Sequence, residues 1–544
     1  MKKFIALMLA LVMVIGLAAC GEKEPNAEAT DPAAPDASDV APDVAAPDAE
    51  KYGGVLDIAT HTDPGSIDPH YTSGTEFYRF SSNVFENPLA QDADGNIVAN
   101  VCEYELSEDG LTLKLWVRDG IVFHDGSAVE IEDVVASLSR AGLLQKNIKK
   151  FFTGFVANVT VADGVATYTF TEYSPNTLYY IAQFQTIASV MPAEICEKYG
   201  EEAFTDVAEC IGTGPYKLDK YTAGIGYEMS RFDGYVPVAE GQTGEAAPKK
   251  AYLDKINLWI NQDDTSRNTA LMNGEYDVTM VDDADYVELL SKQGYTQAQG
   301  GGVKTCYLAF NTKGDRPVND VNLRKAIACL IDIDQFVEIT NATLSFDYDG
   351  SPMPKKNNPY YTDKFQNADY LGKNLELAKQ YLDASNYNGE EIVILAAKYE
   401  DCCVLLESYM REFGLNVKLE YMDQTAAAEY YANNSNPYDI MIAGATQVAS
   451  YPALIPAALK DTYWGNERKD ELFDALSVEP IGSAASMEMW DELSTLWIED
   501  ASIVCLFNFG MLDMHNAELV YESSSTYYTA YYNMYWQNPS AHAE

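Results

Sequence analysis

Basic side chains are scarce in this sequence. Its 544 residues include 36 Lys and Arg against 83 Asp and Glu, which gives a formal net charge of −47 at pH 7. A surface this acidic repels the phosphate backbone of DNA and RNA, so nucleic-acid binding is excluded. The same charge argues against broad docking on an anionic lipid surface.

Catalytic and metal-binding motifs are also missing. The five His include no pair at the i, i+4 spacing of a helical zinc site, and no Cys-x-x-Cys or Gly-x-Ser-x-Gly occurs. Residues 300–305 are Gly-rich, but Val303 stands where a P-loop needs Gly before Lys. Residues 92–103 have EF-hand offsets with Gly95 misplaced, which favours a plain turn between strands. We therefore expect no enzyme, no catalytic residue, no metal and no cofactor.

Long apolar runs are limited to the amino terminus. Residues 4–19 are apolar or small after a basic start, which is too short to span a bilayer comfortably and typical of a signal-peptide core. The run ends in Leu-Ala-Ala-Cys-Gly, which resembles the lipobox of bacterial lipoproteins. That resemblance implies cleavage after residue 19 and a lipid on Cys20. The alternative is an ordinary signal peptide with a Cys at this position by chance.

Residues 20–50 follow with a composition that cannot form a core. The segment consists mostly of Pro, Ala, Asp and Glu, includes three Ala-Pro-Asp repeats and has no aromatic residue. Proline stiffens such a chain and like charges extend it. We interpret it as a disordered tether that holds a domain away from the membrane.

Eight cysteines remain after Cys20. An even number outside the cytoplasm permits disulfides without requiring any. Cys329 and Cys505 lie in apolar runs and are expected in the core, while adjacent Cys402 and Cys403 are either a redox pair or buried thiols.

The remaining chain alternates strand and helix patterns, which indicates an α/β fold. The principal predicted strands are 54–60, 111–118, 216–221, 227–231, 255–260, 276–280, 305–311, 392–396, 416–421, 438–442 and 503–507. The principal predicted helices are 131–144, 265–272, 319–330, 374–384, 404–413, 425–433 and 487–499.

Several of these segments carry family motifs. The motifs are GGVL and SIDP near residue 53, VFENPL from Val84, SEDGLT through VFHDGS to EDVV, GTGPYKL from Gly212, NGEYDV from Asn273, and YLAFN from Tyr307 followed by LRKAI. In this order they resemble the family 5 extracellular solute-binding proteins, the dipeptide-, oligopeptide- and nickel-binding receptors of ABC importers.

That resemblance implies a two-lobed, periplasmic-binding-protein-like (class II) fold with an extra inserted subdomain. The first lobe is expected to contain residues 51–305, with the insertion at about 85–211, and to be completed by 503–544. The second lobe is expected to contain 306–502, with crossings near 307–311 and 503–507. The implied partners are a small peptide or similar solute, an ABC permease with its ATPase subunits, and the membrane through the lipid anchor. We expect a monomer.

Conspicuous polar residues within these motifs have structural interpretations. We expect His124 and Asp125 to form a turn before a helix, although the pair looks catalytic. Gly212 and Gly214 are predicted to set a tight turn that re-enters the sheet. Arg324 is expected to form a structural salt bridge rather than a ligand contact.

The predicted ligand loop departs from the peptide-binding members. There a Gly-Trp segment is followed by an Asp that pairs with the peptide amino group; here Ala445 stands at the Trp position, and no Asp or Glu occurs between residues 440 and 460. A buried ammonium without a carboxylate is costly, so we expect a free peptide amine not to be required at this end. The candidate ligand contacts are Thr75, Glu76, Phe77, Asn311, Thr446, Gln447 and Tyr451.

The sequence therefore predicts a lipid-anchored receptor on the extracytoplasmic face of the cell membrane that captures peptides for uptake. A peptide-sensing receptor without import and a receptor for a non-peptide solute are the alternatives. A surface hydrolase is the third, and the missing nucleophile motifs argue against it.

Overall fold

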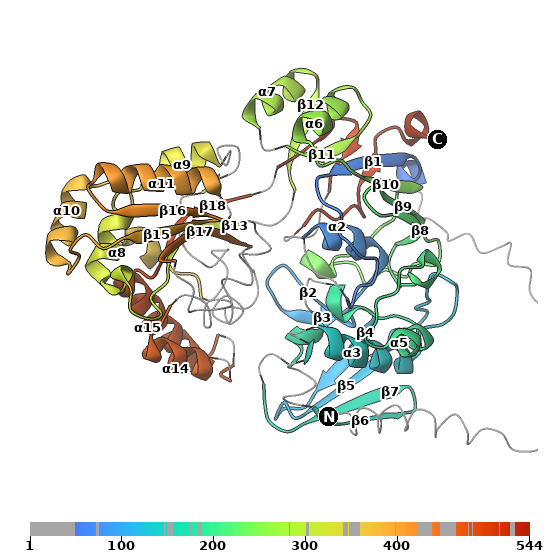
Figure 1. Ribbon diagram of the computed structural model, residues 1–544. Coiled ribbons are helices and arrows are strands. Elements are labelled where there is room, and N and C mark those ends of the chain that lie inside the picture. The colour runs from blue at the N-terminus through green and yellow to red at the C-terminus, as the bar shows by residue number, and fades with distance from the viewer. Residues whose placement is uncertain are drawn as a thin grey trace, which may run out of the picture. The chain divides into compact units, whose positions relative to one another are not determined.

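Two large β-sheets organise the chain, and each is described by itself (Figure 1). In the computed structural model the described residues are 49–71, 75–145, 148–149, 156–174, 177–182, 186–281, 283–300, 304–340, 346–347, 360–397, 399–422, 438–446, 464–476, 478–480, 482–510, 512–522 and 528–543. Within these ranges no helix has both the length and the apolar character needed to cross a membrane.

The first sheet has the strand order β12-β19-β11-β1-β10-β9-β8. Its central strand β1 pairs in parallel with β10 and β11, and the outer pairs are antiparallel. Leu56 and Ile58 of β1 are fully buried, as expected for a central strand. The strands are β1 Val55–Thr60, β8 Tyr216–Thr222, β9 Gly226–Arg231, β10 Lys255–Ile260, β11 Val278–Met280, β12 Tyr295–Gln299 and β19 Leu512–Asn516.

Further elements accompany this sheet in the sequence. The helices are α2 Thr75–Val84, α3 Ile131–Leu144, α5 Ala193–Tyr199, α6 Asp264–Met272 and α7 Ala284–Lys292. A separate antiparallel sheet, ordered β4-β5-β7-β6, consists of β4 Cys102–Leu106, β5 Thr112–Val117, β6 Val156–Ala162 and β7 Val165–Phe170. The hairpin β2 Leu89–Gln91 with β3 Ile97–Ala99 and the pair β20 Leu519–Val520 with β21 Tyr535–Trp536 are smaller. The four-stranded sheet falls inside the range predicted for the inserted subdomain, whose boundaries stay a prediction.

The second sheet has the order β14-β18-β13-β17-β15-β16. β15 is parallel to both β16 and β17, whereas β13 is antiparallel to β17 and β18. The strands are β13 Lys304–Phe310, β14 Phe346–Asp347, β15 Ile392–Ala396, β16 Val417–Tyr421, β17 Ile440–Thr446 and β18 Ile503–Phe509.

Each face of the second sheet has its own apolar core. Leu308 and Phe310 of β13 pack with residues of α8 to α11, while Ala309 between them packs with residues of α14 and α15. This alternation is the period-2 pattern of a strand buried on both faces. The helices are α8 Val321–Ala328, α9 Ile333–Ile339, α10 Leu375–Ala384, α11 Glu400–Glu412, α14 Glu467–Leu476 and α15 Ala484–Asp500.

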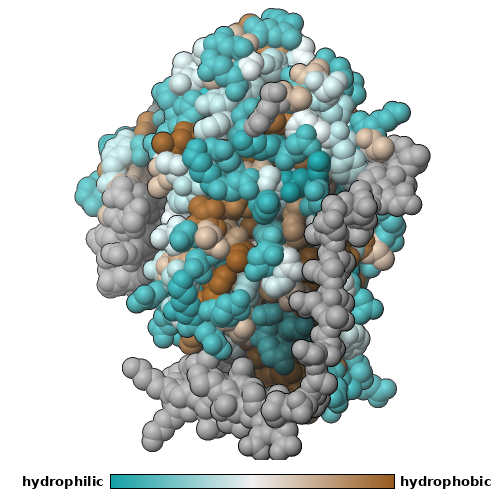
Figure 2. Space-filling view, turned by 90° about the vertical axis from the view of Figure 1, so that its right-hand side faces the viewer, coloured by the Kyte–Doolittle hydropathy of each residue, from teal (hydrophilic) through white to brown (hydrophobic). Residues whose placement is uncertain are grey.

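Short 3₁₀ segments complete the described elements. They are Ala49–Lys51, Tyr179–Ile181, Thr186–Ala188, Val207–Glu209, Gly244–Ala246, Pro317–Asn319, Lys364–Asn367 and Pro539–His542. On the face presented by the space-filling view, polar side chains dominate and apolar ones are concentrated in the middle (Figure 2), consistent with the acidic composition.

Two ion pairs, one fully buried and one partly buried, hold helices α3 and α8 to their neighbours. Arg140 of α3 binds both carboxylate oxygens of Asp68, at 2.7 and 2.9 Å, and donates to the carbonyls of Gly200 and Glu202. Arg324 of α8 lies 2.8 Å from the carboxylate of Asp500. The prediction of a structural salt bridge for Arg324 is confirmed.

Most predicted elements agree with the structure, with shifted ends. α11 starts at Glu400 rather than at residue 404, because Glu400 and Asp401 are polar and the buried Cys402 and Cys403 were not counted as apolar positions of the helix. The strand predicted at 276–280 begins only at Val278. The predicted helix 425–433 lies outside the described residues. Helices α2, α5, α7, α9 and α14 were not predicted.

Candidate functional site

Two neighbouring connections link the two sheets. In the first sheet Gln299 at the end of β12 pairs with Leu512 at the start of β19. In the second sheet Lys304 at the start of β13 pairs with Phe509 at the end of β18. The chain therefore passes between the sheets twice, once between β12 and β13 and once between β18 and β19. The segments expected near the crossings, 307–311 and 503–507, lie largely in β13 and β18.

A buried carboxylate lies beside the first connection. Asp513 of β19 is 1% exposed and accepts hydrogen bonds at one oxygen from the hydroxyls of Tyr521 and Thr529, each at 2.7 Å. The Thr529 hydroxyl is also 2.5 Å from the carbonyl oxygen of Gly300. A Cβ on Gly300 would lie 2.6 Å from the Asp513 carboxyl carbon, so a larger residue here would displace that carboxylate. This cluster ties the end of β12 to the start of β19.

Polar and aromatic side chains also lie at the start of β13 and the end of β18, on opposite faces of the second sheet. Thr305 of β13 donates its hydroxyl to the side-chain oxygen of Asn508 of β18 at 2.8 Å, and both residues are buried. The ring of Tyr399 stands edge-on to Phe509 at 6.5 Å. Its hydroxyl lies against Gly444 of β17, where a Cβ would approach it to 2.3 Å. Burial raises the pKa of Tyr399, so this phenol is neutral at physiological pH.

The predicted ligand contacts are only partly described. Phe77 is buried in α2 and packs edge-on against Tyr78 and Phe80. Asn311 is also buried: its side-chain amide donates to the carbonyl of Tyr438 at 3.2 Å, and its side-chain oxygen accepts from the amide of Lys313. Both side chains are engaged within the protein in this structure.

The other candidates cannot be assessed from side-chain positions. Thr75 and Glu76 are the first residues of α2, and Thr446 is the last of β17, but their side chains are outside the described part. Gln447, Tyr451 and Cys20 lie outside the described residues altogether.

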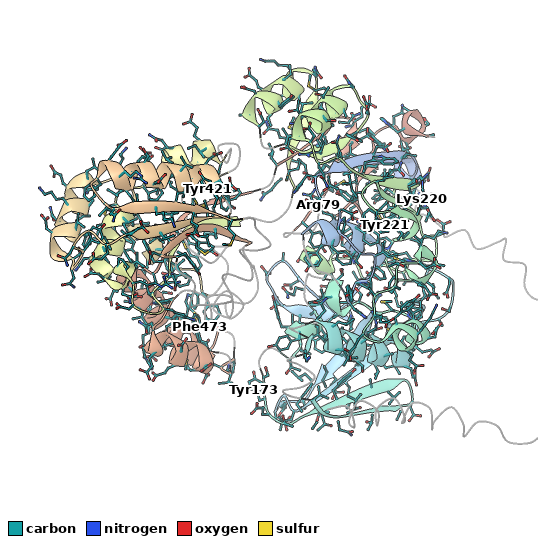
Figure 3. All side chains as sticks on the ribbon, in the orientation of Figure 1. Arg79, Tyr173, Lys220, Tyr221, Tyr421 and Phe473 are labelled. Carbon is teal, nitrogen blue, oxygen red and sulfur yellow. The ribbon has the colours of Figure 1, made fainter. Side chains whose placement is uncertain are left out.

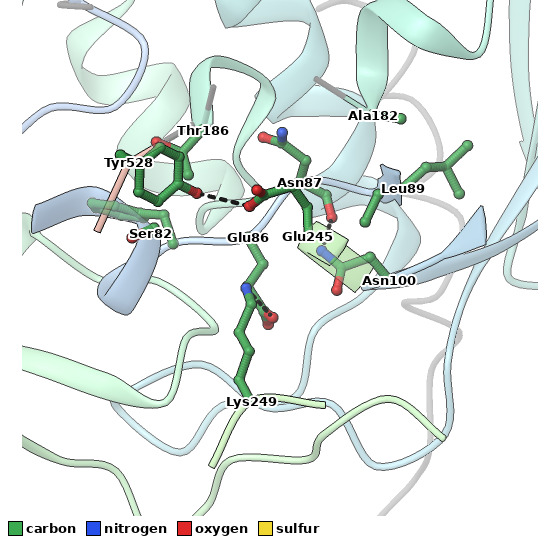
Figure 4. A pocket seen from close by; sticks show the side chains of 12 residues that line it. Ser82, Glu86, Asn87, Leu89, Asn100, Ala182, Thr186, Glu245, Lys249 and Tyr528 are labelled. Carbon is green, nitrogen blue, oxygen red and sulfur yellow. Dashed lines mark hydrogen bonds and ion pairs between the residues drawn. The ribbon is translucent and has the colours of Figure 1, made fainter. Parts of the chain in front are cut away.

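A polar cavity lies at the carboxyl end of α2 (Figure 4). Its wall includes the buried ion pair of Glu86 and Lys249, at 3.0 Å, and Tyr528, which donates to Glu245 at 3.1 Å. The volume of this cavity is about 30 Å³. Since one ordered water needs roughly 10–15 Å³, the cavity has room for about two waters and cannot hold a peptide.

The His124 turn is structural, as predicted. The ring Nε2–H donates to the carbonyl of Gly214 at 3.0 Å, and the amide of Gly212 donates to Nδ1 at 3.2 Å. The contact at Nδ1 requires the neutral ring, because a protonated Nδ1 cannot accept, and burial lowers the pKa of His124 to about 4. Gly212 and Gly214 serve a further purpose that the sequence did not reveal, because their missing Cβ atoms let this turn touch the backbone of Val84 and Asn83.

We expect this ring to make the protein less stable in acid. Below pH 6.5 the unfolded chain protonates His124, whereas the folded chain does not until about pH 4, so stability is lost as the pH falls through this window. The expected loss from this one residue between pH 7 and pH 5 is about 2 kcal/mol. Urea unfolding at both values should show a smaller pH dependence for His124→Gln than for the wild type. An identical dependence in the variant would contradict the neutral-ring assignment.

The described residues contain neither a disulfide nor a cluster of metal-ligand side chains. The eight cysteines after Cys20 are free and buried, which confirms the core placement of Cys329 and Cys505. Burial raises the pKa of Cys402 and Cys403 to about 12, which makes both thiols poor nucleophiles. In the described ranges no group of three or more His, Cys, Asp or Glu side chains could hold a metal ion.

Sequence reasoning missed the residues around the connections. Gly300 was considered only as part of a failed P-loop, and neither Asp513 nor Tyr399 was singled out. The run of three glycines that begins at Gly300 is a sequence signal for a place where two backbone segments approach closely. No local pattern identifies Tyr399, because its contacts come from strands distant in the sequence.

Comparisons with known proteins agree on one family. Residues 96–466 match the family model described as bacterial extracellular solute-binding proteins, family 5, middle. The glutathione-binding protein GsiB of Salmonella paratyphi A is 24% identical over 288 residues, covering 52% of this chain and 53% of that protein. The chain thus spans about half the length of this curated relative.

Solved structures show the same fold. The ABC transporter substrate-binding protein CtaP from Listeria monocytogenes superposes with a TM-score of 0.74 at 20% identity, covering 89% of this chain and 100% of the other. DppA from Helicobacter pylori, in complex with the peptide STSA, gives 0.71 at 18% identity, covering 90% and 100%. These likenesses confirm the predicted two-lobed α/β fold class.

Proposed function

Because the chain belongs to family 5 of the bacterial extracellular solute-binding proteins, we propose that it captures peptides outside the cytoplasm and delivers them to an ABC permease. The family match over residues 96–466 is the observation that carries this proposal. The likeness to a receptor crystallised with a peptide supports peptides as the ligand class. The receptor performs no chemistry in this proposal, and its work is differential binding.

The two connections between the sheets supply the motion. The lobes expected at residues 51–305 with 503–544 and at 306–502 would divide β13 and β18, which pair within the second sheet. We therefore propose lobe boundaries nearer residues 300 and 510, with hinges at the segments around Gly300 and Gly510. Domain closure of the hinge type needs a few residues that absorb backbone rotation, and glycine meets that need with the least strain. Ligand would stabilise the closed state, which the permease would recognise.

A non-peptide solute is the second ligand class. The segment from residue 440 to 460 has no Asp or Glu to pair with a peptide amine, which supports this alternative. A sensing receptor without import remains the alternative for the biological role. A permease and an ATPase encoded beside this protein would favour import.

Uptake by cells tests both the delivery and the anchor. We propose that lipid on Cys20 holds the protein at the membrane, since two or three acyl chains anchor stably. Deleting the gene in the source bacterium should abolish uptake of a labelled peptide, and the wild-type gene should restore it. Cys20→Ser should release the protein from membranes or block its maturation, and restore uptake poorly. Unchanged membrane attachment and mass in Cys20→Ser would contradict the lipid anchor, and unchanged uptake in the deletion strain would contradict import.

A further inference from the structure

The polar cavity at the end of α2 contains an ammonium group with donors to spare. Lys249 lines this cavity and is 7% exposed. An ammonium carries three N–H donors. One of them donates to Glu86 at 3.0 Å, and the group also lies 5.3 Å from the centre of the Tyr532 ring. Glu86 is its one hydrogen-bond acceptor within the described ranges, so two donors are left for an occupant of the cavity.

A buried hydroxyl adds a further polar group to the same space. Ser82 lies on α2 about one turn after Arg79, which Figure 3 labels. The Ser82 side chain lines the cavity and is 2% exposed. Its hydroxyl faces that of Tyr528 without meeting the geometry of a hydrogen bond. Buried polar groups of this kind are usually satisfied by the protein or by ordered water, because leaving them without a partner costs stability.

The charges in the wall decide which occupant is suitable. Lys249 and Tyr235 donate to one oxygen of Glu86, each at 3.0 Å. Thr213 donates to the other oxygen at 3.2 Å, so protein donors already hold this carboxylate. Glu245 is a second carboxylate in the wall (Figure 4). The two carboxylates repel an anion and the ammonium repels a cation, so a neutral molecule that donates and accepts hydrogen bonds fits best.

The size of the cavity narrows the choice further. Its volume is about 30 Å³. An ordered water needs roughly 10–15 Å³ and two to four polar partners. The spare donors of Lys249, the Ser82 hydroxyl and the Glu245 carboxylate supply such partners for two waters, and a larger solute has no room.

We propose that this cavity is a structural water site, in which two ordered waters complete the hydrogen bonds of Lys249 and Ser82. Water that bridges protein groups in this way is nearly as good a link as a direct hydrogen bond. The inference does not depend on the proposed function as a peptide receptor.

The place of the site in the fold gives the waters a structural role. The wall combines the end of α2, the loop that contains Lys249, Tyr528 from the carboxyl-terminal part of the chain, and Leu89 at the start of β2. These segments are far apart in the sequence, and β2 lies near the start of the range predicted for the inserted subdomain. The two waters therefore join that range to the main sheet's surroundings through hydrogen bonds.

A high-resolution crystal structure of the mature wild-type protein tests the site directly. We expect two density peaks in the cavity within about 3.2 Å of Lys249 Nζ, one of them also within that distance of Ser82 Oγ. Crystals soaked in rubidium chloride and in sodium bromide should show no anomalous signal there. A cavity without density, or an anomalous signal from either ion, would overturn the assignment of water.

Oxygen-17 relaxation dispersion counts long-lived internal waters in solution and provides a second test. Ser82→Ala should lower the count by one or two relative to the wild type, because the variant removes a partner of the bound water. Ser137→Ala is the matched control. Ser137 is a fully buried serine of α3 that donates directly to the carbonyl of Met191 at 3.0 Å. Its loss should leave the water count unchanged, even where it lowers the melting temperature.

The water count separates the water site from a purely structural serine. Equal counts in Ser82→Ala and the wild type would show that the Ser82 hydroxyl holds no water, and would overturn its part in the site. The crystal structure of the wild type needs no variant, so a Ser82→Ala protein that fails to fold leaves the proposal open to refutation by an empty cavity.

Discussion

Arg140→Met is expected to lower the free energy of unfolding by about 3–5 kcal/mol, because it leaves the Asp68 carboxylate buried without its cation. Asp68 is fully buried, and Arg140 is only 3% exposed. The arginine also donates to the His70 ring at 3.2 Å, so one substitution removes contacts to several loops. The loss should appear as a lower urea midpoint of unfolding at pH 7.

A matched surface pair and a double variant make this result specific. Arg411 forms a surface ion pair with Glu407, and the Arg411 side chain is 59% exposed. Arg411→Met should therefore lower the free energy of unfolding by less than about 1 kcal/mol. Adding Asp68→Asn to Arg140→Met should recover part of the loss, because the unpaired buried charge is removed. A cost for Arg140→Met no larger than that of Arg411→Met would show that the buried pair does not hold α3 in place.

Gly212→Ala is expected to cost about 3 kcal/mol of stability. The new Cβ would lie 2.1 Å from the carbonyl oxygen of Val84 and 2.7 Å from the Phe85 ring. Backbone atoms cannot rotate away as a flexible side chain can, so the turn before β8 must separate from the end of α2. Thermal unfolding should show the loss directly.

Gly465 provides the control for this substitution. Its Cβ would lie 3.2 Å from the nearest atom, on the protein surface, so Gly465→Ala should cost less than about 1 kcal/mol. Equal stability of the Gly212→Ala and wild-type proteins would mean that the turn and α2 do not approach as closely as the structure places them.

The sequence predicted the fold and the family because both depend on local patterns in chain order. The apolar periodicity of 131–144 matches α3, and the motifs from residue 53 to 332 agree with the family assignment. The turn at His124 and the ion pair of Arg324 were also interpreted correctly, because a polar residue in a turn or a buried Arg in a helix is usually held by partners within the protein.

Helix α2 shows why some elements escaped prediction. Ser81, Ser82 and Asn83 lie in the last turn of this helix and are polar yet buried. The Ser81 hydroxyl lies 2.5 Å from that of Thr186, and Asn83 donates to the carbonyl of Arg79. Phe77, Phe80 and Val84 do have the i, i+3, i+7 spacing of a helix and are buried, so a short helix signal was present and was overlooked among these polar residues.

The candidate site was less predictable for a related reason. Tyr399, Gly444 and Asp513 acquire their roles from contacts between strands that are far apart in the sequence. The one sequence argument about ligand chemistry was an absence, the lack of any Asp or Glu from residue 440 to 460. Most of that segment lies outside the described residues, so the ligand candidates Gln447 and Tyr451 stay predictions.

Reversible peptide binding without chemistry is the central claim, and one titration tests it most directly. The mature protein is titrated calorimetrically with matched free and N-acetylated peptides. The peptide is then recovered, and its mass is measured by mass spectrometry. The account predicts one-to-one binding, affinities that differ by less than tenfold, or about 1.4 kcal/mol, and intact peptide. Cleaved peptide, or no binding of any of these peptides, would contradict the claim. A hundredfold loss on acetylation would show that a carboxylate outside residues 440–460 holds the peptide amine.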